Sequence, residues 1–469
     1  SKRHQYPDTK CHNEECDSFG IEGSTVLQYA TPAGEPSLDK HALGALAKAG
    51  VTQAKRLMEY RAASKLVTSY TNLDTKLHPM DGMLHPTYNQ ARTATGRLSS
   101  SNPNFQQLPK KAGKYIRGCI VPKPKHCLIA ADYAGQEIRI LAAYSKDEKL
   151  IRAYNPCYKC PYNNDPDWRN QFGKCEKENH EKGSKCNVVD IHSYITKQIH
   201  GDAIDVDVSL IKDHPVYDRL RTIAKSVTFA LAYGGSAYGI AETNDIPFEE
   251  AQAILDQYFD TFPGVKTYIL SCQLYVDKYG KITDMVGRTR RFKYAGYLNK
   301  EKEEGFYERY YFQDGLRGVN KQFGSWVRKD RRAATNFPVQ SLAASMTKVA
   351  AIELDNAIFE SGIDAQIVQF IHDELLLTCY RDRASIELAL KLVNDSMTAK
   401  VEMARFNFPN HPLGWAWPPY LDMEADISIG DSYGSMMKPK EYLKVFDQVD
   451  EVLVEKTAEV DLVDAHDVV

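Results

Sequence analysis

The chain lacks any apolar run long enough to cross a membrane, and nothing at its N-terminus has the pattern of a signal peptide. It also lacks a large excess of charge of either sign, because 59 Lys and Arg against 62 Asp and Glu leave a net charge of −3. These absences argue against an integral membrane protein and against a nucleic-acid binder that is basic over its whole surface. We expect a cytosolic protein that works in a reducing compartment.

The positive charge that the chain does have is gathered in short segments. Its clusters are Lys110, Lys111, Lys114, Arg117, Lys123 and Lys125; Arg288, Arg290 and Arg291; and Arg328, Lys329, Arg331 and Arg332. A charge run is more often a solvated face, but local clusters also suit a protein in which one groove holds phosphates. With 469 residues the chain can bury a large core and is expected to form several subdomains.

Two short acidic motifs lie at the ends of apolar, strand-like segments. The first is Asp132-Tyr133-Ala134-Gly135-Gln136-Glu137-Ile138-Arg139, which follows the apolar residues 126–131. The second is His372-Asp373-Glu374, which lies between the apolar segments 365–371 and 375–380 and predicts a β-hairpin with His-Asp at its turn. Two carboxylates brought together from distant strands form a site for Mg²⁺, and a pair of such ions stabilises both oxygens of a phosphoryl displacement. The simpler alternative is that each acid only ends a strand.

A predicted helix between these motifs has a stripe of cations and rings. Arg221, Lys225, Phe229 and Tyr233 recur every four residues, and Gly234-Gly235 predicts where the helix ends. Each step of four advances by only about 40° around an α-helix, so the four side chains lie along one stripe. Such a stripe suits a nucleoside triphosphate, with cations for the phosphates and rings for the base and sugar. The alternative is an amphipathic helix with Arg and Lys at its margin.

Together these segments resemble family A DNA polymerases, the DNA polymerase I type to which the Klenow fragment belongs. Residues 93–109, Thr-Ala-Thr-Gly-Arg-Leu-Ser-Ser-Ser-Asn-Pro-Asn-Phe-Gln-Gln-Leu-Pro, resemble the family's duplex-contacting segment. Asp190-Ile191-His192 resembles its triphosphate-contacting motif, and residues 332–340 resemble its primer–template helix. Order and spacing agree from about residue 36 to about residue 436.

The resemblance implies an α+β fold, the right hand of polymerases with an antiparallel-sheet palm, helical fingers and a helical thumb. Helical periodicity at Leu57, Tyr60, Leu66 and Tyr70 agrees with such a thumb. The implied boundaries are 1–35 for an unassigned N-terminal segment, 36–90 for the thumb, 91–150 for the first part of the palm, 151–329 for the fingers with a Cys-rich insertion at about 155–188, 330–436 for the second part of the palm, and 437–469 for an acidic C-terminal tail.

The implied function is template-directed DNA synthesis, in which a nucleotidyltransferase adds dNTPs to a primer 3′-hydroxyl and releases pyrophosphate through two Mg²⁺ ions. Primer–template DNA and dNTPs are the expected partners of a monomer in the cytoplasm of a bacterium or a virus-infected cell. The sequence starts abruptly, so we expect neither a proofreading domain nor a 5′-nuclease domain in this chain.

The matching positions imply roles for individual residues. The Mg²⁺ ligands would be Asp132 and Asp373, with Glu374 in support. The residues expected to contact the nucleotide are Glu137, His192, Arg221, Lys225, Phe229 and Tyr233. The residues expected to contact the primer–template are Arg97, Asn104, Arg332, Asn336, Gln340 and His372.

The chain also departs from the family pattern. Ala134-Gly135-Gln136 stands where the family commonly has Ser-Gln-Ile, and Gln107 stands where an Asn is usual. Both changes lie at expected contacts with nucleotide or template, so fidelity and sugar selectivity do not carry over from the family.

Three other functions compete with DNA synthesis. A single-subunit RNA polymerase shares the right hand, but the resemblance gives Glu137 the task of crowding the ribose 2′ position. A non-catalytic DNA clamp would have no use for Asp132 and Asp373 together with Arg221 and Lys225. A phosphodiesterase or nuclease would use paired carboxylates, but would leave the aromatic part of the stripe without a role.

The Cys-rich insertion has no counterpart in the family. Cys157 and Cys160 form a Cys-x₂-Cys pair, and Cys175 and Cys186 follow. This pattern predicts one structural Zn²⁺, which would fold a polar segment that is too small for its own core. His180 could replace one thiolate, and Cys11 and Cys16 could compete as ligands. The alternatives are a flexible loop with free thiols and, less consistent with a reducing compartment, a disulfide pair.

Overall fold

The computed structural model describes residues 38–108, 113–154, 190–296, 317–398, 411–418, 421 and 423–447. The chain divides into two compact units, Ser1–Thr87 and Tyr88–Val469. None of the helices within these described ranges is long and apolar enough to span a membrane.

The first unit is built on two helices that pack against each other, α2 (Lys40–Lys48) and α3 (Thr52–Tyr70), followed by the 3₁₀ turn η1 (Asp74–Lys76). Helix α2 begins where it does because the Asp39 carboxylate accepts a hydrogen bond from the Ala42 amide at 2.8 Å. The helical periodicity predicted around Leu57 and Leu66 is confirmed, but Tyr60 on this helix is 69% exposed.

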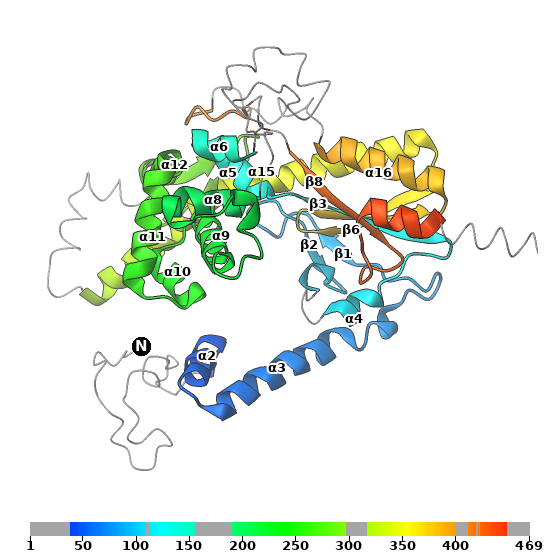
Figure 1. The fold of residues 1–469 in the computed structure, drawn as a ribbon, viewed down its shortest axis with the longest axis horizontal. Coiled ribbons are helices and arrows are strands. Elements are labelled where there is room, and N and C mark those ends of the chain that lie inside the picture. The colour runs from blue at the N-terminus through cyan, green and yellow to red at the C-terminus, as the bar shows by residue number, and fades with distance from the viewer. Residues whose placement is uncertain are drawn as a thin grey trace, which may run out of the picture. The chain divides into compact units, whose positions relative to one another are not determined.

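The second unit contains an antiparallel sheet in the strand order β6-β7-β3-β8. Its strands are β3 (His126–Tyr133), β6 (Ala365–Ile371), β7 (Glu374–Tyr380) and β8 (Ala425–Gly430). Helices α15 (Arg317–Ser361) and α16 (Arg383–Thr398) pack against these strands, as Figure 1 shows. The structure therefore confirms the antiparallel palm sheet, with the strands expected before Asp132 and around Asp373.

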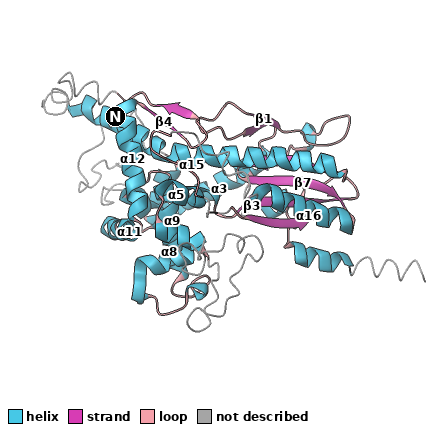
Figure 2. Ribbon diagram, turned by 90° about the horizontal axis from the view of Figure 1, so that it is seen from above, coloured by secondary structure: helices cyan, strands magenta, loops and turns pink. Residues whose placement is uncertain are grey.

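Helices gather beside this sheet in both views (Figures 1 and 2). They are α5 (Gln136–Ser145), α6 (Glu148–Tyr154), α8 (Ile191–His200), α9 (Asp218–Ala232), α10 (Ala237–Asn244), α11 (Phe248–Thr261) and α12 (Pro263–Tyr279), with 3₁₀ turns η3 (Gly201–Ala203) and η4 (Val208–Leu210). The helical character predicted for residues 190–280 is confirmed. The buried Asp147 carboxylate joins two of these helices by accepting hydrogen bonds from the Leu150 amide at 3.1 Å and the Gly264 amide at 2.9 Å.

The segment that precedes β3 is hydrogen-bonded to β6, the edge strand of the sheet. It contains the paired strands β1 (Thr87–Asn89) and β2 (Ser99–Ser101), the 3₁₀ turn η2 (Phe105–Gln107) and α4 (Gly113–Gly118). The Phe370 backbone on β6 donates to the Tyr88 hydroxyl at 3.0 Å, and its carbonyl accepts from the Gln106 amide group at 3.2 Å. These bonds place the predicted duplex-contacting segment next to the His-Asp-Glu hairpin.

Helix α15 continues through Pro338, a residue that usually breaks a helix because it has no N–H to donate. Two tyrosine hydroxyls satisfy carbonyls near this point. Tyr268 donates to Thr335 at 2.8 Å, and Tyr144 donates to Pro338 at 3.3 Å. The short hairpin of β4 (Lys281–Thr283) and β5 (Thr289–Arg291) also contacts this helix.

Part of the predicted C-terminal tail is structured. Met437 forms an isolated bridge with Ile429 on β8, and residues 439–447 are helical. The buried Tyr442 in this helix donates its hydroxyl hydrogen to Asp431 at 2.8 Å. Residues 437–447 therefore pack on the palm sheet, while the rest of the tail lies outside the described residues.

Candidate active site

The sheet brings the two acidic motifs together. Asp132 on β3 lies opposite Glu374, the first residue of β7, and opposite Asp426 on the other neighbouring strand, β8. Directly opposed residues of antiparallel strands point to the same face, with Cβ atoms about 4.5–5.5 Å apart. Asp373 comes just before this row, at the tip of the β6–β7 hairpin. The register therefore makes a row of carboxylates across the sheet, and Asp426 belongs to it although sequence patterns gave no reason to include it.

The turn of the hairpin has an unusual backbone at His372. This residue has a φ of 62°, in the left-handed region, and its side chain is exposed. Residues other than Gly are uncommon in that region, although His is found there more often than most. The two-residue turn confirms the predicted hairpin and sets Asp373 and Glu374 where the strands meet.

A tyrosine hydroxyl and an arginine lie beside the acidic row. Tyr433 donates to the Glu374 carboxylate at 2.8 Å, and the Arg117 guanidinium lies over the Tyr433 ring, 4.6 Å from its centroid. Burial, followed by the charge of Glu374, raises the pKa of Tyr433, so its hydroxyl stays protonated and remains a donor at neutral pH. Sequence analysis gave Tyr433 no role.

Glu137, on the first turn of α5, joins two of the predicted motifs. Its buried carboxylate accepts hydrogen bonds from the Arg97 guanidinium at 2.6 Å and from the Tyr233 hydroxyl. Burial and the charge of Glu137 raise the pKa of Tyr233 to about 12, and Gln340 on α15 opposes this with a hydrogen bond. The structure thus gathers Arg97, Glu137, Tyr233 and Gln340 from separate parts of the chain.

Helix α9 presents the predicted stripe. Ile223, Ala224 and Val227 are buried on the opposite face, whereas Lys225 and the C-cap residue Tyr233 are exposed. The helix ends at Ala232, as Gly234-Gly235 predicted, and Gly234 has a φ of 66°. A Cβ on Gly234 would lie 2.9 Å from the Arg332 Cα on α15, so only glycine allows this close approach. The end of the stripe is therefore held against the predicted primer–template helix.

The first cation of the stripe, Arg221, pairs with Asp190, the N-cap residue of the preceding helix α8. The Arg221 guanidinium donates through Nε and Nη2 to both oxygens of Asp190, at 2.8 and 2.9 Å. Asp190 also caps α8 by accepting from the Ser193 amide at 2.8 Å. Burial of Asp190 opposes its ionisation, but the hydrogen bonds from Arg221 and Ser193 outweigh it and lower the pKa of Asp190 to about 2. Sequence reasoning gave Asp190 no separate role.

His192 lies on the first turn of α8, close to the aromatic part of the stripe. Its ring centroid is 5.8 Å from that of Phe229, and its Nδ1 is buried without a hydrogen-bond partner among the described residues. Burial lowers the pKa of His192 to about 4, with smaller contributions from Lys225 and Arg221. The imidazole is therefore neutral at pH 7.

The similarity of this chain to known proteins fits this geometry. The family model for DNA polymerase family A matches residues 21–434, which include every segment described above except residues 437–447 of the C-terminal tail. This chain belongs to DNA polymerase family A. It is 31% identical over 355 residues to DNA polymerase I of Pseudomonas aeruginosa, a match that covers 75% of this chain and 32% of that protein. It is 29% identical over 382 residues to the thermostable DNA polymerase I of Thermus aquaticus, covering 81% of this chain and 36% of that protein.

A solved family A structure has the same fold. It is the POL domain of Pol1 from M. smegmatis in complex with a DNA primer–template and dNTP, with a TM-score of 0.63 and 28% identity over 86% of this chain and 57% of that one. The right-hand polymerase fold predicted from the sequence is thereby confirmed. The chain spans only about a third of the length of the two relatives named above.

The residues expected to contact the primer–template include Asn104 beside η2 and three residues of α15. Asn104 accepts a hydrogen bond from the Gln106 amide at 3.0 Å and so caps η2. Arg332, Asn336 and Gln340 follow one another at intervals of four on α15 and therefore share a face. Arg332 is exposed, and the Asn336 Oδ1 is buried without a partner among the described residues.

Arg288, in one of the basic clusters, is used internally. Its guanidinium donates to the Thr95 carbonyl at 3.3 Å and to the hydroxyls of Ser341 at 2.9 Å and Ser345 at 3.2 Å. The side chain approaches Gly96 so closely that a Cβ there would lie 2.5 Å from Nη1. Arg288 therefore joins the predicted duplex-contacting segment to α15, a role that charge clustering alone did not reveal.

The predicted zinc ligands Cys157, Cys160, Cys175 and Cys186 lie outside the described residues. Of the cysteines within those residues, Cys127, Cys272 and Cys379 are buried free thiols and Cys119 is exposed. The zinc site stays a prediction.

Proposed function

We propose that this chain catalyses template-directed DNA synthesis, adding dNTPs to a primer 3′-hydroxyl with release of pyrophosphate. The observation that carries the proposal is the strand register, which sets Asp132 opposite Glu374 beside the Asp373 turn. The cation and ring stripe of α9 and the Arg97–Glu137–Tyr233 contacts support it from the nucleotide side. Membership of the family makes DNA polymerisation the expected chemistry.

The acidic row fits Mg²⁺ by its chemistry. Asp132, Asp373 and Glu374 offer only carboxylate oxygens, the donors that this ion prefers. One or two carboxylates suffice for Mg²⁺, because this ion takes its remaining ligands from water and substrate phosphates. Asp132 and Asp373 would hold two Mg²⁺ ions, which would favour loss of the primer hydroxyl proton and neutralise charge on the leaving pyrophosphate.

The stripe of α9 would bind the triphosphate. Lys225 is exposed, and Arg221 keeps Nη1 outside its paired contact with Asp190, although this nitrogen also lies 3.9 Å from Oδ1 of the exposed Asp218. Both cations would stabilise the charge of the phosphates, and the neutral His192 would contribute a hydrogen bond rather than a charge. Asp190 would position Arg221, because it fixes one edge of the guanidinium and leaves the other for the substrate.

Glu137 and the aromatic residues would form the sugar pocket. Two hydrogen bonds hold the Glu137 carboxylate in place, so it cannot move aside easily for an extra ribose hydroxyl. Phe229 occupies the position where the family has either Phe or Tyr, and a Tyr hydroxyl there substitutes for a missing 3′-hydroxyl. The fixed Glu137 is what favours a DNA polymerase over a single-subunit RNA polymerase.

The remaining assigned residues would contact the primer–template. Arg332, Asn336 and Gln340 form one stripe of α15, and His372 lies exposed at the hairpin tip. Arg97 and Asn104 belong to the segment fastened beside that hairpin. Contacts of this kind to backbone and minor groove check shape rather than sequence.

The subdomain roles follow from the same proposal. The thumb would include α2 and α3, the palm would hold the four-stranded sheet, and the fingers would be the helices from α8 to α12. Closing of the fingers would bring α9 onto the nascent base pair, so that fit is tested before chemistry.

Extension of a labelled primer separates the proposal from its rivals. On a DNA template we expect addition of dNTPs in preference to NTPs, with each added nucleotide set by the template base. Addition of NTPs in preference would support the RNA polymerase alternative, and degradation of the primer without extension would support a nuclease. Binding of DNA without extension or degradation of the primer would support the alternative of a non-catalytic DNA clamp.

A further inference from the structure

The first unit carries a cluster of metal-ligand side chains that DNA synthesis does not use. His78, Asp81 and His85 each offer one ligand atom, and these atoms all lie within 4.8 Å of one another. Two imidazole nitrogens with one carboxylate form a donor set unlike the all-carboxylate row on the palm sheet. Borderline cations such as Zn²⁺ favour such nitrogen-containing sets, whereas Mg²⁺ favours oxygen donors.

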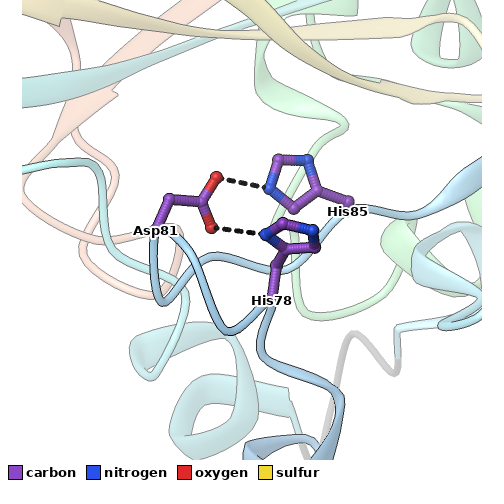
Figure 3. Close-up of side chains that lie close together, drawn as sticks. All are labelled: His78, Asp81 and His85. Carbon is purple, nitrogen blue, oxygen red and sulfur yellow. Dashed lines mark hydrogen bonds and ion pairs between the residues drawn. The ribbon is translucent and has the colours of Figure 1, made fainter.

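The carboxylate of Asp81 faces both rings from one side, with one oxygen toward each ring, as Figure 3 shows. Its Oδ1 is 3.7 Å from His78 Nδ1, and its Oδ2 is 2.8 Å from His85 Nε2. In a tetrahedral zinc site with bonds of about 2.1 Å, neighbouring ligand atoms are about 3.4 Å apart. These two distances run to different oxygens of the carboxylate and lie on either side of that value, and the three ligand atoms all lie within 4.8 Å of one another, so their spacing is close to that around a single ion.

The backbone of the loop already holds these ligands in place. The His78 amide donates to the Met83 carbonyl at 2.7 Å, and the His78 carbonyl accepts from the Gly82 amide at 2.8 Å. The Met83 amide also donates to Asp81 Oδ1 at 2.9 Å. Binding a cation would therefore require little ordering of the backbone.

We propose that His78, Asp81 and His85 bind one Zn²⁺ ion, with water completing its coordination. The side chains are 50%, 40% and 57% exposed, which leaves room for a solvent ligand. The ion would stabilise the loop that follows η1 by cross-linking His78 to His85. This proposal uses none of the residues of the predicted cysteine site or of the proposed Mg²⁺ site, and it does not depend on the proposed function.

The test is a competition titration of the full chain against a zinc indicator dye, after chelator treatment and with excess Mg²⁺ present. Mg²⁺ occupies carboxylate sites, so the titration counts sites that contain nitrogen or sulfur donors. The variants are His78→Gln with His85→Gln, and Asp81→Asn, whose amide oxygen can still accept from Met83. The matched control is Asp74→Asn, which changes another exposed carboxylate of the same unit.

We expect the double histidine variant to lose one equivalent of bound Zn²⁺ relative to the unchanged chain. Asp81→Asn should lower the affinity of this site for Zn²⁺ by about 100-fold or more, because loss of even an outer-shell partner typically lowers metal affinity 10- to 100-fold. Asp74→Asn should bind as the unchanged chain does. Circular dichroism checks that the variants are folded, and any cysteine-bound Zn²⁺ cancels in the difference. Equal stoichiometry and affinity in the unchanged chain, the double histidine variant and Asp81→Asn would overturn the proposal.

Discussion

Replacing Asp190 by Asn tests whether this residue positions Arg221, the arginine proposed to bind the triphosphate. An Asn side chain keeps an oxygen for the Ser193 amide at the start of α8, but it loses the charged, two-point contact with Arg221. The change therefore removes the ion pair and leaves the helix cap. It acts on one contact of the proposed nucleotide site without touching the acidic row.

The size of the effect follows from the pKa of Asp190. A fall from 3.8 to about 2 corresponds to about 2.4 kcal/mol at about 1.36 kcal/mol per pH unit, before solvent screening is considered. Because the Asp190 side chain is 32% exposed, we discount this to about 1 kcal/mol. A carboxyl with a lowered pKa stabilises the fold fully above pH 3.8, and this stability is lost as the pH falls through about 2.

In steady-state primer extension at neutral pH, Asp190→Asn should raise the KM for dNTP by about fivefold, the ratio that about 1 kcal/mol gives, and should leave kcat nearly unchanged. Urea unfolding should show a loss of about 1 kcal/mol. Asp218→Asn is the matched control, because Asp218 lies 3.9 Å from Arg221 but is 44% exposed, so its effect should be small. An unchanged KM in Asp190→Asn would mean that Asp190 does not position Arg221, and a lowered KM would mean that Asp190 competes with the triphosphate for it.

Three further predictions concern side chains around the nucleotide and the acidic row. Phe229→Tyr should relax discrimination against dideoxynucleotides, and Glu137→Ala should admit ribonucleotides more readily. The measurement is competitive incorporation of each analogue against the matching dNTP. Unchanged incorporation ratios in both variants would mean that the sugar pocket is misplaced. His192 should titrate with a midpoint near pH 4 in NMR spectra of the free protein. Because burial favours the neutral form, the contribution of His192 to the free energy of unfolding should be complete above pH 6.5 and should fall between pH 6.5 and about 4. A titration midpoint near 6.5 would contradict this. Tyr433→Phe should lower kcat about fivefold through loss of one hydrogen bond to Glu374, while a kcat equal to that of the unchanged chain would remove Tyr433 from the site.

Local patterns predicted the elements of the site because those elements are determined by short segments. Alternating and apolar runs around Asp132 and Asp373 specify strands, and a four-residue repeat from Arg221 to Tyr233 specifies one face of a helix. The Gly234-Gly235 pair specifies the end of that helix. The family resemblance then supplied what these patterns cannot, which is that separate segments meet in one sheet.

Contacts between distant segments could not be read from the sequence. The Asp190–Arg221 pair depends on how α8 and α9 pack, and Asp426 joins the acidic row only through the register of β8 with β3. Arg288 was grouped with other cations by its neighbours in the chain, but the packing of α15 uses it internally. Charge and spacing identify candidate side chains, whereas tertiary packing decides which of them face a substrate.

Removing the two proposed metal anchors is the most direct test of DNA synthesis at the acidic row. We expect Asp132→Ala and Asp373→Ala each to slow single-turnover primer extension by about three orders of magnitude or more, the effect of several kcal/mol of lost charge stabilisation. Affinity for primer–template DNA should stay close to that of the unchanged chain, because the residues proposed to contact the DNA are unchanged. Asp364→Asn is the control, since Asp364 is 57% exposed beside the same sheet and pairs with Lys123. Near-normal extension by either alanine variant would contradict the account.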